Sequence, residues 1–341
     1  MSPDAPSRPA QDPAGLVESV APDHNLDAVL TANVYCNLQD QGLLDVRGED
    51  AGSFLQGQIT QDIHRINASQ SHLAAHCTSK GRMLALCRVI RQAEGYQLLM
   101  PRTQLPTLRK RLQLYVLRAR VELGDDSDTT LCIGLGGPAL ETLLARHCLL
   151  PDTVDRVTAN EGLRLIRVAG DPPRFLLLGE TDAVSPVMAE LAPQLTPVGT
   201  EAWRLRDILA GIPAVHPQTS DQFVPQMANL DILDGISLKK GCYTGQEIVA
   251  RSHYLGKLKR RMFRLDLSDG HAAPGMAVVS EADPGQPAGM VVDSAPQPGG
   301  GEALLAVLRL EARDASLHLE TPEGPVLQPA PLPYGIPQPE R

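Results

Sequence analysis

The run Lys239–Glu247, which reads KKGCYTGQE, is the most informative part of this 341-residue chain. Thr244 is followed three residues later by Glu247, which is the spacing of a capping box, so a helix is expected to begin there. Cys242 and Tyr243 would lie just before that helix. Exposed backbone amides and the positive end of the helix dipole favour an anion at such a position. The run therefore predicts a cysteine in an anion-favouring place.

Cys242 is the best candidate for a reactive thiolate, because the start of a helix lowers the pKa of a thiol. Lys239 and Lys240 precede it and add positive charge. Gly241 lets the backbone turn or come close to another group. We therefore assign a thiol-based role to Cys242, with Lys240 and Tyr243 beside it. The alternative interpretation is that Cys242 is a small buried filler and that the lysines are solvated.

Further segments of the chain, taken with this run, resemble one known family. The part from Lys240 to Glu247 looks like the signature motif of the YgfZ family, which includes a mitochondrial iron–sulfur assembly homologue. The resemblance covers about residues 33 to 262, and this motif is its most specific part. The supporting segments are Phe54–Asp62, His76–Arg82, Ala210–Pro213, Phe223–Gln226, Asn229–Leu230 and Gly235–Ser237.

The resemblance implies an α+β, T-protein-like folate-binding fold, with pseudo-symmetric subdomains around a central hole and a small C-terminal β-barrel. It implies a folate-binding accessory protein that supports the assembly or repair of iron–sulfur clusters in other enzymes, including tRNA-modifying ones. The cofactor would be tetrahydrofolate or a related reduced folate. The partners would be iron–sulfur enzymes or cluster-assembly proteins. The residues expected to bind the cofactor are Trp203, Gln226, Asn229, Gln246, Glu247, Arg251 and Arg118.

The chain departs at two places from the aminomethyltransferase of glycine cleavage, which the expected fold resembles. That enzyme carries acidic residues just after a Gly-Gly-Ile-like turn, whereas Gly81–Leu86 has no carboxylate for acid–base chemistry. Near the turn Ala210–Pro213 many relatives place a glutamate, but this chain has Leu209, with Asp207 two residues earlier. A tetrahydrofolate-dependent, aminomethyltransferase-like one-carbon enzyme is therefore the alternative function, and a classical enzyme is not expected.

Two further features concern anion binding. Trp203 is the single tryptophan in a chain with 3% aromatic residues, so it is a candidate for a binding surface, with core filling as the alternative. Arg118 is a lesser candidate. The segment Lys239–Arg261 holds seven basic residues against one acid, Glu247. This segment could dock the glutamate tail of folate or an RNA phosphate, or it could be a solvated face.

The residue pattern divides the chain into four parts. Residues 1–30 contain five prolines in the first 22 and predict a flexible leader. Residues 31–256 alternate strand and helix signals in two units, about 31–125 and 126–256, which is typical of an α+β body. Short strands separated by glycine and proline predict a β-barrel over 257–320. The Pro-rich stretch 321–341 predicts a weakly ordered tail.

Within the first unit, local signals predict individual elements. Val34–Cys36 and Leu43–Val46 read as strands joined by a turn. Asp50 is expected to cap the helix that follows. Thr103–Tyr115 fits an amphipathic helix.

Composition excludes some functional classes. The net charge of −9 opposes direct binding of nucleic acid or of anionic membranes. No stretch approaches the roughly 18 apolar residues that span a bilayer. The six cysteines are scattered, without a Cys-x-x-Cys pair, which suits a reducing compartment and argues against a built-in metal site. The expected location is the cytoplasm.

Overall fold

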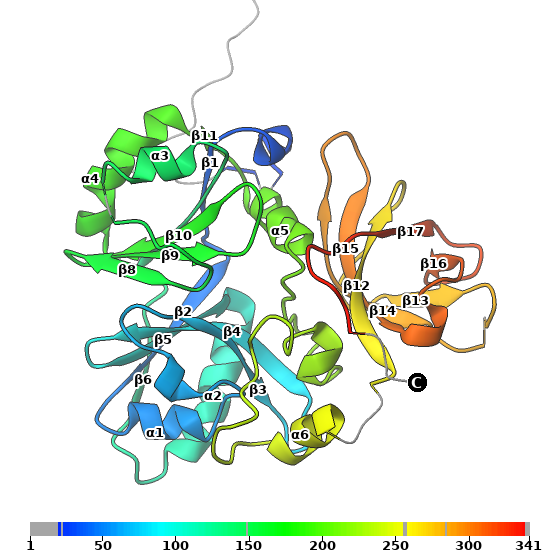
Figure 1. Cartoon of the computed structure of the whole chain (residues 1–341), viewed down its shortest axis with the longest axis horizontal. Coiled ribbons are helices and arrows are strands. Elements are labelled where there is room, and N and C mark those ends of the chain that lie inside the picture. The colour runs from blue at the N-terminus through cyan, green and yellow to red at the C-terminus, as the bar shows by residue number, and fades with distance from the viewer. Residues whose placement is uncertain (1–19, 22, 148, 255–257, 284, 338–341) are drawn as a thin grey trace, which may run out of the picture.

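The computed structural model describes residues 20–21, 23–147, 149–254, 258–283 and 285–337. These residues form an α+β protein with two open sheets and one closed barrel. Figure 1 shows the two sheet-containing parts stacked on one side of the molecule and the barrel on the other, with α5 (Thr200–Leu209) between them. Within the described residues, no helix has the length and apolar character needed to cross a membrane.

The first sheet has the strand order β3-β4-β5-β2-β6. Alternate residues of a strand point to opposite faces of a sheet. Leu98 and Met100 accordingly pack with the helices that cover the outer face, whereas Leu99 joins the core on the inner face. The elements of this part are β2 (Gln41–Arg47), α1 (Ala51–Gln56), β3 (His72–Cys77), β4 (Met83–Gln92), β5 (Gly95–Pro101), α2 (Leu105–Val116) and β6 (Glu122–Asp125).

The second sheet has the order β11-β1-β7-β10-β9-β8 and follows the same rule. Phe175 and Leu177 pack under α3 (Leu140–Leu144) and α4 (Thr181–Leu191), whereas Leu176 and Leu178 face the first sheet. The elements are β1 (Val34–Asn37), β7 (Leu131–Gly136), α3 (Leu140–Leu144), β8 (Val157–Asn160), β9 (Leu163–Val168), β10 (Arg174–Gly179), α4 (Thr181–Leu191) and β11 (Thr196–Pro197).

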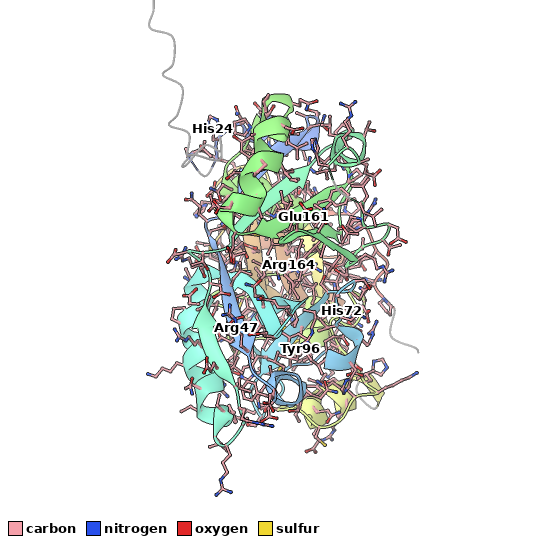
Figure 2. The ribbon with its side chains drawn as sticks, turned by 90° about the vertical axis from the view of Figure 1, so that its left-hand side faces the viewer. His24, Arg47, His72, Tyr96, Glu161 and Arg164 are labelled. Atoms are coloured by element: carbon pink, nitrogen blue, oxygen red, sulfur yellow. The ribbon has the colours of Figure 1, made fainter. Side chains whose placement is uncertain are left out.

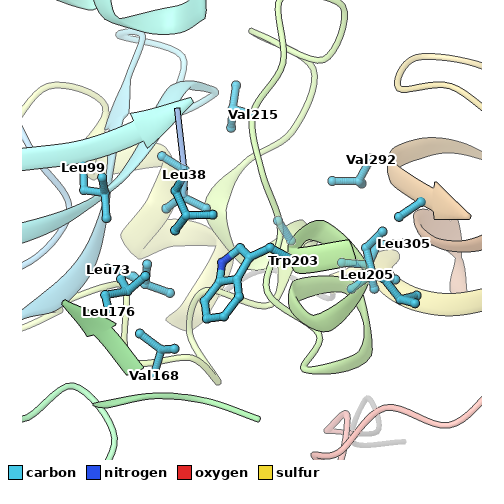
Figure 3. Packing of buried hydrophobic residues seen from close by; sticks show 14 of the residues in the cluster. Leu38, Leu73, Leu99, Val168, Leu176, Trp203, Leu205, Val215, Val292 and Leu305 are labelled. Carbon is cyan, nitrogen blue, oxygen red and sulfur yellow. The ribbon is translucent and has the colours of Figure 1, made fainter. Parts of the chain in front are cut away.

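One apolar core joins both sheets, α5 and the barrel. Figure 3 shows Trp203 between residues of the two sheets, among them Leu73 and Leu176, while Leu205 of the same helix faces the barrel. Because the two sides of one helix are buried against different parts, α5 fixes the barrel relative to the sheets. The molecule therefore shares a continuous core and is not a row of independent domains.

The barrel closes in the order β12-β15-β14-β13-β16-β17. Its strands are β12 (Arg260–Leu267), β13 (Ala277–Ser280), β14 (Gly289–Pro296), β15 (Glu302–Arg309), β16 (Leu317–Leu319) and β17 (Val326–Ala330). The remaining helical elements are α6 (Gln246–Tyr254) and six 3-10 turns: η1 (Leu26–Leu30), η2 (Ile63–Arg65), η3 (Arg102–Gln104), η4 (Ala192–Gln194), η5 (Pro225–Ala228) and η6 (Leu310–Ala312).

One local expectation for the first unit is confirmed and one is wrong. β1 and β2 are strands joined by a turn, as predicted, but they do not pair with each other: β1 pairs with β7 and β11 of the second sheet, and β2 pairs with β5 and β6 of the first. Asp50 precedes α1 but makes no side-chain cap, because its carboxylate accepts the backbone N–H of Arg120 (2.8 Å). Long-range contacts decide both the strand partners and the partner of Asp50.

The ends of the chain are more ordered than their composition predicts, where the structure describes them. Leu26–Leu30 of the expected leader forms η1, and the buried Val29 belongs to the shared core. In the expected tail, β17 pairs with β12, and its one proline, Pro329, is tolerated because it lies beyond the residues of β17 that pair with β16. Tyr334 then packs against the turn that follows α5, where its hydroxyl donates to the carbonyl of Gly211 (2.7 Å). The expected domain boundary at residue 257 lies outside the described residues.

Candidate functional site

Three of the segments that carry the family resemblance meet at one place, which we call the motif junction. It consists of the loop 57–62 after α1, the turn 78–82 between β3 and β4, and the loop 237–246 before α6. Thr60 links two of them, because its hydroxyl donates to the carbonyl of Gly235 (2.7 Å) and its carbonyl accepts the N–H of Ser237 (2.9 Å). The backbone N–H of Thr244 donates to the carbonyl of Gly57 (3.3 Å). Segments far apart in sequence thus build a single site.

Lys240 holds the motif junction together from inside. Its side chain is 7% exposed, and Nζ donates to the carbonyls of Ile59 (2.7 Å) and Gln61 (2.8 Å). Nζ also lies 4.9 Å from the centre of the Tyr243 ring. Burial lowers the pKa of Lys240 to about 8, against the opposing charge of Asp62. Lys240 is therefore neither solvated nor free to serve as an exposed charge beside the thiol, whereas Lys239 is exposed.

Two glycines allow the turn and the motif loop to approach closely. Gly245 has φ +85°, and a Cβ there would lie 2.4 Å from the carbonyl oxygen of Thr78. Gly81 has φ +68°, and its Cβ would lie 2.9 Å from the side chain of Ile248 on α6. Both positions combine the left-handed conformation with a contact that excludes a side chain. The glycines in these motifs are therefore explained by packing.

Cys242 is exposed at the surface of this junction, which excludes the alternative of a buried filler. Tyr243 next to it is buried, and its hydroxyl has no hydrogen-bond partner among the described residues. Burial raises the pKa of the Tyr243 phenol above its usual range. α6 begins at Gln246, so Gly245 and not Thr244 directly precedes the helix. The cysteine therefore lies on the loop that leads into α6, and its activation stays a prediction.

The other described cysteines differ from Cys242 in their surroundings. Burial raises the pKa of their thiols, which removes them as competing thiolates; they are Cys36, Cys77, Cys87 and Cys132. No group of three or more His, Cys, Asp or Glu side chains in the described part of the chain is placed to hold a metal ion. Cys242 is thus a distinct thiol within this part of the chain.

Gln226 and Asn229, expected to bind the cofactor, are buried amides that support other elements. Gln226 Nε2 donates to the carbonyl of Val249 in α6 (2.7 Å), and the backbone carbonyl of Gln226 accepts from Arg261 Nη1 (2.9 Å). Asn229 Nδ2 donates to the carbonyl of Met262 at the start of the barrel (2.8 Å). These contacts fix α6 and β12 relative to each other. Neither residue lines the central cavity described next.

A central cavity of about 120 Å³ lies between the two sheets and α5. Trp203 is buried in the core and also lines this cavity. Asp207, one helical turn further along α5, lines it too, and its carboxylate accepts Arg174 Nη2 (2.8 Å). Burial raises the pKa of Asp207, and Arg174 opposes this. Arg88, paired with Asp155, adds a buried cation to the lining.

Asp207 and Arg88 are absent from the residues assigned by sequence. The sequence could have indicated Asp207, because residues four apart on a helix share a face and Trp203 is itself a predicted binding residue. Leu209, which stands where many relatives have a glutamate, does not line this cavity and faces a different one. The acidic group available to the central cavity is thus Asp207.

The remaining predicted residues are spread over the surface. Arg118 is exposed just beyond α2, and Glu247 and Arg251 are exposed on α6. Gln246 belongs to the motif junction, since its Nε2 donates to the carbonyl of Lys240 (3.3 Å). Cys242 is not among the residues that line the central cavity. The predicted site therefore resolves into two regions, a thiol region and a cavity region.

The basic segment 239–261 is less cationic at the surface than its sequence predicts. Lys240 is buried, and Arg261 makes a bidentate ion pair with Asp231 (2.6 and 2.8 Å). Lys257 lies outside the described residues. The exposed cations that remain are Lys239, Arg251, Lys259 and Arg260.

A third region is a wide polar hollow of about 790 Å³ at the edges of the two sheets. Figure 2 shows Arg47, Glu161 and Arg164, which line it, on one face of the molecule. Arg47 is paired with Asp126 (3.0 Å), and Glu161 adds another negative charge. The mixture of signs gives this hollow no preference for an anion or a cation.

Comparison with known proteins gives relatives by sequence and by structure. The chain is 31% identical to the tRNA-modifying protein YgfZ of Colwellia psychrerythraea over 239 residues, which is 70% of this chain and 73% of the relative. It is 36% identical to the protein of the same name from Yersinia pseudotuberculosis over 230 residues, 67% of this chain and 69% of the relative. No family model matches the sequence.

A solved structure with the same fold is the glycine cleavage system aminomethyltransferase T from Bartonella henselae. The TM-score is 0.71 at 13% identity, and the match covers 89% of this chain and 86% of that one. At this identity the likeness concerns the fold alone. The T-protein-like fold that the resemblance implied is confirmed.

Proposed function

Because this chain belongs to the YgfZ family, we propose that it is a folate-binding accessory protein that supports the assembly or repair of iron–sulfur clusters in partner enzymes, tRNA-modifying enzymes among them. The observation that carries the proposal is the exposed thiol of Cys242, presented at a junction of three motif segments, two of which Lys240 joins. The protein acts in the cytoplasm, and its effect on tRNA is exerted through those enzymes.

Cys242 supplies the chemistry of the thiol region. A thiolate is a soft ligand for iron and a nucleophile towards sulfur. An exposed loop can present such a ligand to a cluster on another protein, and the rigid junction beneath keeps the loop in a defined place. The exposed cations Lys239 and Arg251 favour approach of an acidic partner surface.

Tetrahydrofolate fits the character of the central cavity. Trp203 offers an aromatic face to the pterin ring, and the Asp207 carboxylate can accept its neighbouring N–H donors. A cavity of about 120 Å³ is smaller than the roughly 300 Å³ or more of typical ligand sites. It would therefore enclose the ring end alone and leave the glutamate tail outside. Bound folate would supply one-carbon or reducing capacity, while these residues bind and orient it.

Replacement of the thiol tests the proposal. Cys242→Ala should fail to restore the activity of iron–sulfur enzymes in a strain that lacks this protein, because the variant keeps the fold but has no thiol. Lys239→Ala, at an exposed neighbour, should restore it. Thermal unfolding of both variants should match that of the unchanged protein. Full restoration by Cys242→Ala would remove the thiol from the proposed role.

The aminomethyltransferase alternative is favoured by one observation, the shared fold with a TM-score of 0.71. The turn that begins at Gly81 opposes it. Met83 and Leu84, at the start of β4, carry no carboxylate that could move a proton. The purified protein should therefore form no 5,10-methylenetetrahydrofolate from tetrahydrofolate and an aminomethyl donor. A turnover rate above that of a heat-denatured sample would restore this alternative.

A further inference from the structure

A second cavity, of about 410 Å³, lies on the far side of α5 from the central cavity. We call it the tail cavity, because Pro333 and Tyr334 of the C-terminal segment form one wall. η1, the end of α5 and the residues between β9 and β10 form the others. Figure 1 shows the C-terminal segment running beside α5. The two cavities share no lining residue.

A buried guanidinium group with free hydrogen-bonding capacity lines the tail cavity. Arg174 is 1% exposed. Its Nε and Nη2 donate to the carbonyl of Ala169 (2.9 and 2.6 Å), and Nη2 also meets Asp207. Nη1 is buried without a partner among the described residues. An unpaired buried donor of this kind is costly, so it indicates a missing acceptor.

Arg206, also buried, adds a second cation to the same wall. Its Nε donates to the carbonyl of Val29 (2.7 Å), and Nη2 reaches the same oxygen. No carboxylate in the described part of the chain lies within ion-pair distance of it. Burial and the neighbouring Arg174 lower the pKa of Arg206 to about 10. Two guanidinium groups thus face one buried carboxylate, Asp207, which leaves about one positive charge unbalanced.

The rest of the lining is mainly apolar. The side chains of Leu30, Leu209, Leu233 and Pro172 contribute to the walls, and Asp171 lies exposed at the rim, where water screens its charge. The volume falls within the roughly 300–1,000 Å³ of sites for small molecules. An apolar enclosure lined by two guanidinium groups with a single excess positive charge suits a planar monoanion and disfavours a dianion, whose desolvation costs more.

We propose that the tail cavity binds a small monocarboxylate with an apolar body, whose carboxylate is held by the guanidinium groups of Arg174 and Arg206 that line it. This site is separate from the proposed folate site. Arg174 lies between the two, since its guanidinium stacks at 4.9 Å on the ring of Trp203. Binding in the tail cavity therefore alters the surroundings of the single tryptophan.

The C-terminal segment closes this site by a specific contact. Gly211 has φ +67°, and a Cβ there would lie 2.6 Å from the ring of Tyr334. Asn229 Nδ2 also reaches the Tyr334 hydroxyl (3.4 Å). The closely fitted ring makes the segment a wall of the cavity, and displacement of this wall gives the ligand a route of entry.

The test uses the full chain, benzoate as the probe and the neutral, near-isosteric benzamide as its matched control. Benzoate should change Trp203 fluorescence saturably, and benzamide should bind at least tenfold more weakly. Leu233→Phe, which fills the tail cavity, should weaken benzoate at least tenfold. Ile212→Phe, which fills the central cavity, should leave it unchanged. Arg174→Met should abolish benzoate binding. If Arg174→Met does not fold, Leu233→Phe and Ile212→Phe still test the proposal.

Three results would overturn the proposal. An equal response to benzoate and benzamide would show that charge is not recognised. No saturable response would show a cavity that holds only water. Loss of binding in Ile212→Phe with retention in Leu233→Phe would place the probe in the central cavity instead.

Discussion

Lys240 shows how one side chain can secure a loop that carries a reactive group. Its ammonium is buried, which is unfavourable by itself, and two backbone carbonyls from the loop after α1 compensate. Those carbonyls in turn gain a donor that no other described side chain supplies. The flexible stem of lysine reaches them from a loop that itself stays at the surface. The position of Cys242 therefore depends on a buried neighbour two residues before it.

Replacing Lys240 by methionine keeps the volume and removes the donors. The free energy of unfolding should fall by about 1–3 kcal/mol, because two buried carbonyls lose their partner. Lys239→Met, at an exposed site, should change it by less than about 0.5 kcal/mol. Urea unfolding at pH 7 measures both. Equal stability of the two variants would contradict the structural role.

The stability that Lys240 contributes should also depend on pH. Lys240 has a pKa of about 8 in the folded chain, below the value of 10.5 for a free lysine. Between these values the unfolded chain binds more protons than the folded one, so raising the pH through this window favours folding. The stability difference between the unchanged protein and Lys240→Met should therefore grow in favour of the former from pH 8 to pH 10. A constant difference would contradict this.

Glycines allow the elements of the motif junction to approach each other closely. The sequence predicts only part of this arrangement. The motif run correctly predicts that a helix begins after the cysteine, because cap and turn residues act locally. It does not reveal why Gly245 is required, since the carbonyl that excludes a side chain belongs to Thr78, more than 160 residues away. The pairing of β1 with the second sheet was missed for the same reason, because register between distant strands leaves no local pattern.

Gly245→Ala should therefore destabilise the protein strongly, and Gly241→Ala should not. The first combines a left-handed φ of +85° with a Cβ contact of 2.4 Å to a backbone oxygen, whereas nothing lies within 4 Å of a Cβ at Gly241. We expect a loss of about 2 kcal/mol or more for the first and within about 0.5 kcal/mol for the second. Differential scanning calorimetry provides the comparison. Similar melting temperatures would refute the packing argument.

Across the molecule as a whole, the charge opposes direct binding of RNA, which we therefore do not expect. The net charge is −9, and two of the cations in the basic segment, Lys240 and Arg261, are buried and paired. The net charge follows from composition, whereas the burial of these two cations depends on contacts between segments distant in sequence. The central cavity was likewise implied by family resemblance alone, since its lining comes from strands and a helix that are distant in sequence.

Binding to unmodified tRNA should consequently be weak. We expect no saturable complex below about 10 µM at near-physiological salt, and any weak binding should fall steeply as salt rises, as contacts with phosphate alone do. Fluorescence anisotropy of labelled tRNA, titrated at two salt concentrations, measures this. Tight binding that persists at raised salt would show direct recognition of RNA.

The split of the N-terminal strands has a consequence for how such a molecule can be divided. β1 lies early in the chain but completes the sheet of the second half, next to β7 and β11. Cutting the polypeptide between residues 125 and 126 would therefore take a structural strand from the half that needs it. Each half expressed alone would expose unpaired edge strands and aggregate, whereas the two co-expressed fragments would reassociate through β1.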